Sequence, residues 1–164
     1  MPATYEPIAT TTLGSAATII SFSSIPQTFT DIRIVLSIKG VTTAGSPVRI
    51  EMNNDAANFG ATWIYGDGAS VVSGRGANTY GRLSGNIGIA GTGPLLVTCD
   101  LLSYTGSTQK TLLAEFTNDN NGTGGVARTV NLFLSTAAIT QLTLRYDGTF
   151  AIGTTATLYG IKNA

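Results

Sequence analysis

Hydrophobic and polar residues alternate along most of this chain with a period of two. The clearest case is residues 31–39, where four large aliphatic residues share one parity and mostly polar residues fill the other: Ile32, Ile34, Leu36 and Ile38. Successive side chains of a β-strand point to opposite faces, so this pattern predicts a strand with one buried face. The spacing of an amphipathic helix does not persist over any useful length. The pattern therefore predicts an all-β protein.

About ten segments share this alternation, separated by clusters of Gly, Asn, Asp, Ser or Pro. They are residues 17–22, 31–39, 48–53, 61–66, 81–91, 95–104, 110–118, 127–135, 139–147 and 155–163. Short strands at regular intervals are typical of an antiparallel sandwich or barrel. Glycine-rich segments such as residues 73–78 predict turns, and Asp147-Gly148 predicts a hairpin. A length of 164 residues without repeat or linker predicts one domain.

The parity also predicts which face of each strand meets the core. In residues 127–135 the apolar positions are Val130, Leu132 and Leu134, so this side should point inward. Residues 95–102 differ, because both parities are apolar near the start of the segment. Two interpretations remain open: a central strand covered on both faces, or a strand with one face against a neighbouring subunit.

The charge content is unusually low. Charged residues make up 11% of the chain, and nine basic residues balance nine acidic ones. An average domain carries roughly 25% charged residues. Net charge near zero favours association. The chain is therefore either a poorly soluble monomer or, as we favour, a subunit that packs against other subunits.

Several function classes lack their usual signals. No basic cluster predicts nucleic-acid binding, and no apolar run approaches the ~20 residues of a membrane helix. The N-terminal segment lacks the basic and apolar regions of a secretory signal. Without histidine, a Ser-His-Asp or Cys-His system cannot form. The lone Cys99 shares the parity of its apolar neighbours and should be a buried core thiol.

The remaining chemical candidates are few. Asp100 and Glu115 lie in strand-like segments, either facing each other as an acid/base pair or, as we favour, pointing outward on separate strands. The Asn/Asp-rich residues 51–58 and 118–125 can be calcium loops or, as we favour, Asx turns. Trp63 and Tyr65 can stack on a glycan or pack in the core or an interface. We expect no catalytic residues, no cofactor and no metal.

Both ends of the chain resemble small structural proteins of tailed-phage virions. Residues 2–36 follow an opening pattern of the form Y-E-P-I-A-T-x-T-L-G-S, then an alternating strand, then F-S-S-I-P-x-T-Y-T-D-L. The residues that match are Tyr5, Glu6, Pro7, Ile8, Ala9, Thr10, Phe22, Ser23, Ser24, Ile25, Pro26, Thr28, Thr30 and Asp31; Phe29 replaces a common tyrosine. The closing L-Y-G-I of that family is matched by Leu158, Tyr159, Gly160 and Ile161. Residues 40–150 resemble that family only in general pattern, with Gly/Asn/Ser-rich loops between alternating strands.

The resemblance implies an all-β, antiparallel, jelly-roll-like β-sandwich of about 8–10 strands, whose first and last strands can pair. Residues 1–13 are expected to form an N-terminal arm or first edge segment, and residues 14–164 a single sandwich domain. Candidate assembly contacts in the first segment are Tyr5, Pro7, Ile8 and Leu13.

The resemblance also implies a non-enzymatic capsid decoration, or cement, protein. Such a protein bridges and stabilises major capsid subunits on the outer surface of the phage head, and is made in the host cytoplasm. Its expected partners are the major capsid protein and copies of itself in a homotrimer, with no nucleic acid and no membrane. The alternative is a tail-fibre, collar or spike subunit that binds a host-surface glycan through Trp63 and Tyr65.

Overall fold

The computed structural model describes residues 5–43, 47–85, 94–119 and 124–162, which form β-strands and the turns between them. The strands are β1 (Tyr5–Thr12), β2 (Ala17–Phe22), β3 (Asp31–Ile38), β4 (Val41–Thr43), β5 (Arg49–Met52), β6 (Phe59–Gly66), β7 (Val71–Thr79), β8 (Gly81–Arg82), β9 (Leu95–Leu102), β10 (Lys110–Asp119), β11 (Gly124–Phe133), β12 (Leu142–Phe150) and β13 (Thr155–Ile161). The all-β prediction is confirmed, although the thirteen strands of the described residues exceed the expected 8–10.

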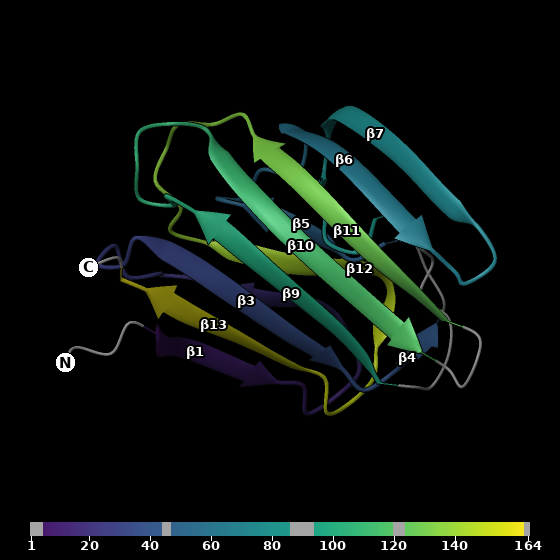
Figure 1. Cartoon of the computed structure of the whole chain (residues 1–164). Helices are drawn as coiled ribbons and strands as arrows, with labels where there is room; N and C mark the ends of the chain where they lie inside the picture. The colour runs from purple at the N-terminus through teal and green to yellow at the C-terminus, as the bar shows by residue number, and fades with distance from the viewer. Residues whose placement is uncertain (1–4, 44–46, 86–93, 120–123, 163–164) are drawn as a thin grey trace.

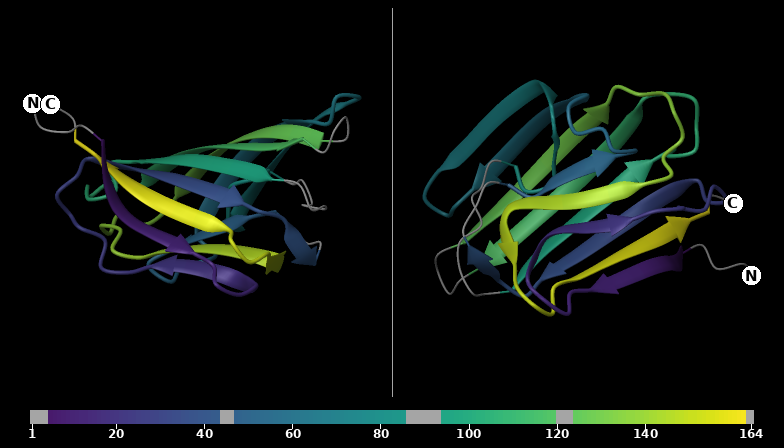
Figure 2. Two further views of the ribbon diagram at one scale, coloured as in Figure 1. Left: turned by 90° about the horizontal axis from the view of Figure 1, so that it is seen from below. Right: turned by 180° about the vertical axis from the view of Figure 1, so that it is seen from behind.

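The strands form two antiparallel sheets that pack face to face (Figures 1 and 2). The large sheet has eight strands in the order β1-β13-β3-β9-β10-β11-β6-β7. The small sheet has the order β2-β12-β5-β8, with β4 also paired to β12. The first and last strands of the chain, β1 and β13, pair with each other.

The strand order confirms a jelly roll. In that fold eight strands, lettered B to I, form two sheets with the orders B-I-D-G and C-H-E-F. Here β1-β13-β3-β9 matches the first order and β2-β12-β5-β8 the second, with the strands taken in chain sequence. Consecutive strands therefore alternate between the two sheets around most of the barrel-like core.

Two additional hairpins widen the large sheet beyond this eight-stranded frame. The β6–β7 hairpin is inserted between β5 and β8, and the β10–β11 hairpin between β9 and β12. They join side by side, so that the large sheet continues from β9 through β10, β11, β6 and β7 (Figure 1). The small sheet covers only part of this extension.

The core lies between the sheets and follows the predicted parity in most strands. Ile32, Ile34, Leu36 and Ile38 of β3 are fully buried. Cys99 of β9 is a buried free thiol, as predicted, and burial raises its pKa. Each such strand presents its apolar face to the opposite sheet, as in a two-layer sandwich.

Two predicted turns are wrong. Residues 73–78 belong to strand β7, where Gly74 is required because a Cβ atom there would come within 2.5 Å of the Trp63 ring. Asp147-Gly148 lies inside β12, which continues through a register shift between Arg145 and Phe150. The buried rings of Tyr146 and Phe150, 5.2 Å apart, hold both sides of this shift against the core.

Candidate interaction face

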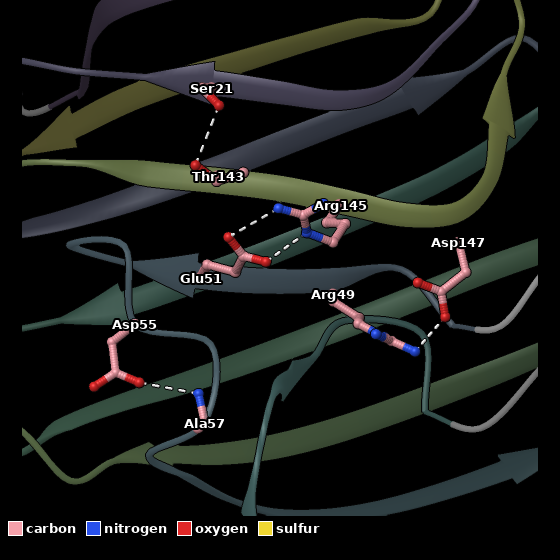
Figure 3. Close-up of polar contacts among 8 residues, drawn as sticks. All are labelled: Ser21, Arg49, Glu51, Asp55, Ala57, Thr143, Arg145 and Asp147. Carbon is pink, nitrogen blue, oxygen red and sulfur yellow. Dashed lines mark hydrogen bonds and ion pairs between the residues drawn. The ribbon is translucent and has the colours of Figure 1, made fainter.

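The outer face of the small sheet is polar and internally paired. Figure 3 shows its cross-strand contacts, which are Ser21–Thr143 at 3.1 Å, Arg145 Nε to Glu51 Oε1 at 2.5 Å, and the ion pair Arg49–Asp147. The hydrogen bond that Arg145 donates to the Glu51 carboxylate also raises the pKa of Arg145. This face has the composition expected of a sheet that faces water.

The outer face of the large sheet is different, because large aliphatic side chains are exposed across β9, β10, β11, β6 and β7. Eight of them, with exposed fractions from 38% to 73%, are Leu96, Leu102, Leu113, Val126, Val130, Leu132, Ile64 and Val71. The strand register places them on one side of the sheet. We call this set the aliphatic face.

Strand β9 decides between the two interpretations of residues 95–102. Leu95, Val97 and Leu101 are buried, whereas Leu96 and Leu102 are 42% and 38% exposed. The described residues therefore do not cover this strand on both faces. Leucine doublets in the sequence mark the same situation, since each doublet sends one side chain inward and one outward.

Strand β11 is inverted relative to the prediction from its parity. Val130 and Leu132 point outward, as does Leu134 just after the strand, with exposed fractions of 38–46%, and the polar residues Thr129 and Asn131 are fully buried. The prediction that this apolar side faces the core is therefore wrong. A one-residue slip would exchange the two faces, so the inversion depends on what holds the buried side.

Asn131 holds β11 by pairing with the backbone of Arg82 in β8. Its Oδ1 atom accepts a hydrogen bond from the Arg82 N–H at 2.8 Å, and its Nδ2 atom donates to the Arg82 carbonyl at 2.8 Å. The Thr129 hydroxyl donates to the same carbonyl, also at 2.8 Å. The very short strand β8 thus has its backbone polar groups satisfied by side chains of the opposite sheet.

Two ion pairs lie on this side of the large sheet, one at the centre of the aliphatic face and one at its β9 edge, next to β3. Arg33 contacts Asp100 at 3.6 Å, and Arg128 contacts Glu115 at 2.6 Å. Asp100 and Glu115 are therefore outward-pointing residues on neighbouring strands, as we favoured. They are not directly opposite, since Asp100 pairs in register with Leu113. Each carboxylate is engaged by an arginine, so the face carries no net charge from these four groups.

Two hollows of the aliphatic face lie at glycines of β6. One, of about 390 Å³, is lined by Gly66, Val71 and Val126 among others. The second, of about 500 Å³, is lined by Gly60, Leu132 and Arg75 among others. The sequence does not indicate these hollows, because the register that brings β7 and β11 beside each glycine is a tertiary feature.

The aromatic candidates Trp63 and Tyr65 point to the inner side of β6. The Trp63 ring packs against Gly74, and the Arg82 guanidinium lies 4.4 Å from the ring centroid. Tyr65 is half-buried and packs against the core. Arg82, which the sequence analysis did not single out, lies over Tyr80 as well, at 4.7 Å.

The four candidate assembly contacts lie in or next to the edge strand β1. Tyr5 is 44% exposed and stacks on Tyr159 of β13 with ring centroids 4.7 Å apart. Pro7 is exposed at a register shift between β1 and β13. Ile8 and Leu13 are half-buried against the core. The described part of residues 1–13 is thus paired within the sheet.

No group of three potential metal ligands occurs among the described residues. In residues 51–58, Asp55 accepts hydrogen bonds from the backbone N–H groups of Ala57 and Asn58, which confirms the Asx turn and lowers the pKa of this carboxyl. Residues 120–123 of the second Asn/Asp-rich loop lie outside the described residues. The described chain also contains no helix of the length and hydrophobicity that a membrane span requires.

Comparison with known proteins yields little. No protein-family model and no curated protein matches this sequence. Among solved structures, the chain is similar to the CBM2 module of the evolved Dit protein of Lactobacillus casei BL23 phage J-1, with 9% identity, 91% of this chain and 69% of that chain covered, and a TM-score of 0.20. A structure of infectious bursal disease virus, Gx strain, shares 15% identity over 96% of this chain and 39% of that chain, with a TM-score of 0.14. Both TM-scores are too low to indicate a common fold.

Proposed function

We propose that this chain is a non-enzymatic structural protein of a tailed-phage virion, and that it acts as a capsid decoration, or cement, protein. The observation that carries the proposal is the aliphatic face. A sheet face of this kind is typical of a subunit that is completed by another subunit. The resemblance of residues 2–36 and 156–164 to virion proteins supplies the biological setting.

The composition of the face supports protein as its partner. Burial of apolar surface contributes roughly 25 cal/mol per Å², so eight exposed aliphatic side chains represent a substantial driving force for association. The ion pairs Arg33–Asp100 and Arg128–Glu115 are already formed within the chain, so association does not leave these charges without a counterion. Low overall charge further favours close packing of many copies.

The mechanism follows from these contacts. A decoration protein on the outer surface of the head would hold neighbouring subunits together through many buried contacts and so resist internal pressure. Its proposed partners are the major capsid protein and copies of itself. No nucleic acid or membrane is part of this proposal.

No second function is proposed, because no observation favours glycan binding. Sugar rings stack on exposed aromatic faces, whereas Trp63 packs against Gly74 and Arg82. None of the eight residues of the aliphatic face is aromatic.

Location and copy number in purified particles test the proposal. Antibody labelling over the head and hundreds of copies per particle, counted by mass spectrometry, are expected. Particles assembled without the protein should lose their DNA at lower temperature than complete particles. A few copies at a tail or collar, absence from particles, or unchanged stability after deletion would contradict the proposed role.

A further inference from the structure

We propose that the partner of the aliphatic face is a second copy of this chain, packed face to face about a twofold axis. The axis lies between the two copies, above the β10–β11 ladder, and runs parallel to these strands. This inference rests on the proposed function, since it names the subunit that completes the same face. Three features of the molecule support it: the strand register, the two hollows and the central charges.

The register determines which strands would meet. Moving outward from the β10–β11 ladder, β9 follows β10 on one side and β6 follows β11 on the other. A twofold axis along this ladder places β10 of one copy over β11 of the second, and β9 over β6. Positions at the same height along the sheet remain at the same height.

Under this operation the projecting leucines of β9 meet the hollows of β6. Leu96 and Gly66 lie in one row, linked through Thr117 and Val126. Leu102 and Gly60 lie in another row, linked through Thr111 and Leu132. Both pairs are separated by six residues, or about 20 Å of strand. Leu96 and Leu102 of each copy therefore reach the hollows at Gly66 and Gly60 of the second copy.

Among the described residues, neither a close neighbour nor the backbone conformation requires glycine at position 60. A Cβ atom added there would meet nothing within 4 Å, and its φ is not in the left-handed region. Glycine weakens a strand interior, and in such positions often marks the close approach of another chain. The open space above Gly60 is explained if the second copy fills it.

The central charges of the face, Glu115 and Arg128, are complementary under the same operation. Glu115 of one copy lies opposite Arg128 of the second copy, and Arg128 opposite Glu115, because these residues are direct neighbours across the β10–β11 ladder. The Glu115–Arg128 pairs of the two copies then form a four-charge cluster of alternating sign. Leu113 meets Val130 of the second copy, so aliphatic contacts adjoin the charges.

The available area is adequate for a specific contact. Five strands spaced by ~4.8 Å and about seven residues of ~3.3 Å each cover roughly 550 Å² in projection. Side-chain relief raises the accessible area above this value, towards the ~800 Å² that each partner of a standard interface buries. Two twisted sheets pack in this way at a small angle.

The test moves the large side chain from position 102 to the hollow at position 60. Gly60→Leu fills the hollow and should weaken self-association of the purified chain by about tenfold or more, measured by sedimentation equilibrium. Adding Leu102→Ala in the same chain removes the colliding side chain and should restore association. The control is Gly14→Leu, since Gly14 also has open space around its Cβ position but lies outside the face. Thermal melting verifies that each variant is folded.

The inference is supported if the purified protein has the molecular mass of two chains, if Gly60→Leu lowers this mass to one chain, and if the double variant with Leu102→Ala regains it. A monomer at all concentrations, a mass of three chains, or a dimer unaffected by Gly60→Leu would overturn it. None of these results removes the protein from the virion, so location in particles remains a separate test of the proposed function. Conversely, a dimer of a protein that is absent from particles would overturn only the proposed function.

Discussion

The two outer faces of this sandwich expose different kinds of side chain. On the small sheet, neighbouring strands satisfy each other with hydroxyl pairs and ion pairs such as Glu51–Arg145 (Figure 3). On the large sheet, eight aliphatic side chains stand in solvent around two ion pairs. A sandwich that functions alone would have polar residues on both outer faces. This difference in composition is the observation on which the proposed subunit contact of the large sheet rests.

The inversion of β11 strengthens this comparison. Its polar residues are buried at a cost that the chain offsets with three hydrogen bonds to Arg82. Apolar residues at the same inner positions would need no such arrangement. The aliphatic face is therefore maintained by specific contacts on its reverse side, and the following experiments test each part of this contrast.

The largest effect is expected from removing the contact that holds β11. Asn131→Ala leaves the Arg82 N–H without its acceptor in a buried site and creates a small cavity, so it should lower the free energy of unfolding by about 2–4 kcal/mol. Val130→Ala, on the exposed side of the same strand, should cost about 0.5 kcal/mol. Urea unfolding measures both. Equal effects would show that the buried amide does not hold the strand.

The next largest effect is expected on self-association, which should depend on one outer face and not on the other. Leu113→Asp on the aliphatic face and Ile19→Asp on the small sheet replace residues of similar exposure, 43% and 37%. Leu113→Asp places a carboxylate next to Asp100 and in the contact, and should weaken self-association about tenfold or more. Ile19→Asp places a carboxylate beside Arg145 on the small sheet and should leave self-association unchanged. Sedimentation velocity compares them; a loss in both variants would contradict a face-specific contact.

A smaller difference is expected between the ion pairs of the two faces. Glu51 is only 14% exposed in its side chain, whereas Glu115 and Arg128 are 55% and 72% exposed. Glu51→Ala should therefore cost about 1–2 kcal/mol of stability in the isolated chain. Glu115→Ala should cost less than about 0.5 kcal/mol there, because solvent screens the pair. Comparable losses in monomer unfolding would show that the central pair of the aliphatic face is already desolvated.

The smallest effect concerns two Asx turns, one at each sheet. Backbone N–H groups donate to Asp55 after β5 and to Asp67 between β6 and β7, and lower the pKa of both carboxyls below 3.8. Because the folded pKa is below the unfolded one, the stabilisation is complete above about pH 4 and is lost as the pH falls through the folded pKa. Carboxyl NMR titration should give midpoints below 3.8 for both residues. A midpoint at or above 3.8 would show that the turn does not hold the charged form.

Much of the fold could be predicted from local alternation and from the resemblance at the two ends. The parity of residues 31–39 correctly predicted the buried face of β3, and the resemblance correctly implied a jelly roll with its terminal strands paired. Strand β7 was missed, because its glycines indicate a turn when considered locally. Their role becomes visible only when the Trp63 ring is seen against Gly74.

The candidate site could be predicted only in part. The two-sided apolar character of residues 95–102 indicated a possible subunit contact, and the exposure of Leu96 and Leu102 agrees with that interpretation. The alternation of residues 127–135 gave the opposite of the true orientation. Glycines 60 and 66 carried no signal, because a hollow is defined by neighbouring strands rather than by the residue itself.

The sequence alone thus determined that the chain forms strands with two chemically distinct faces. Only the tertiary structure decided which face of each strand is buried. The physical reason is that alternation records a difference between two sides but not the environment of either side. In β11 that environment is the backbone of Arg82, a segment 49 residues away from Asn131, whose polar groups made the polar side the buried one.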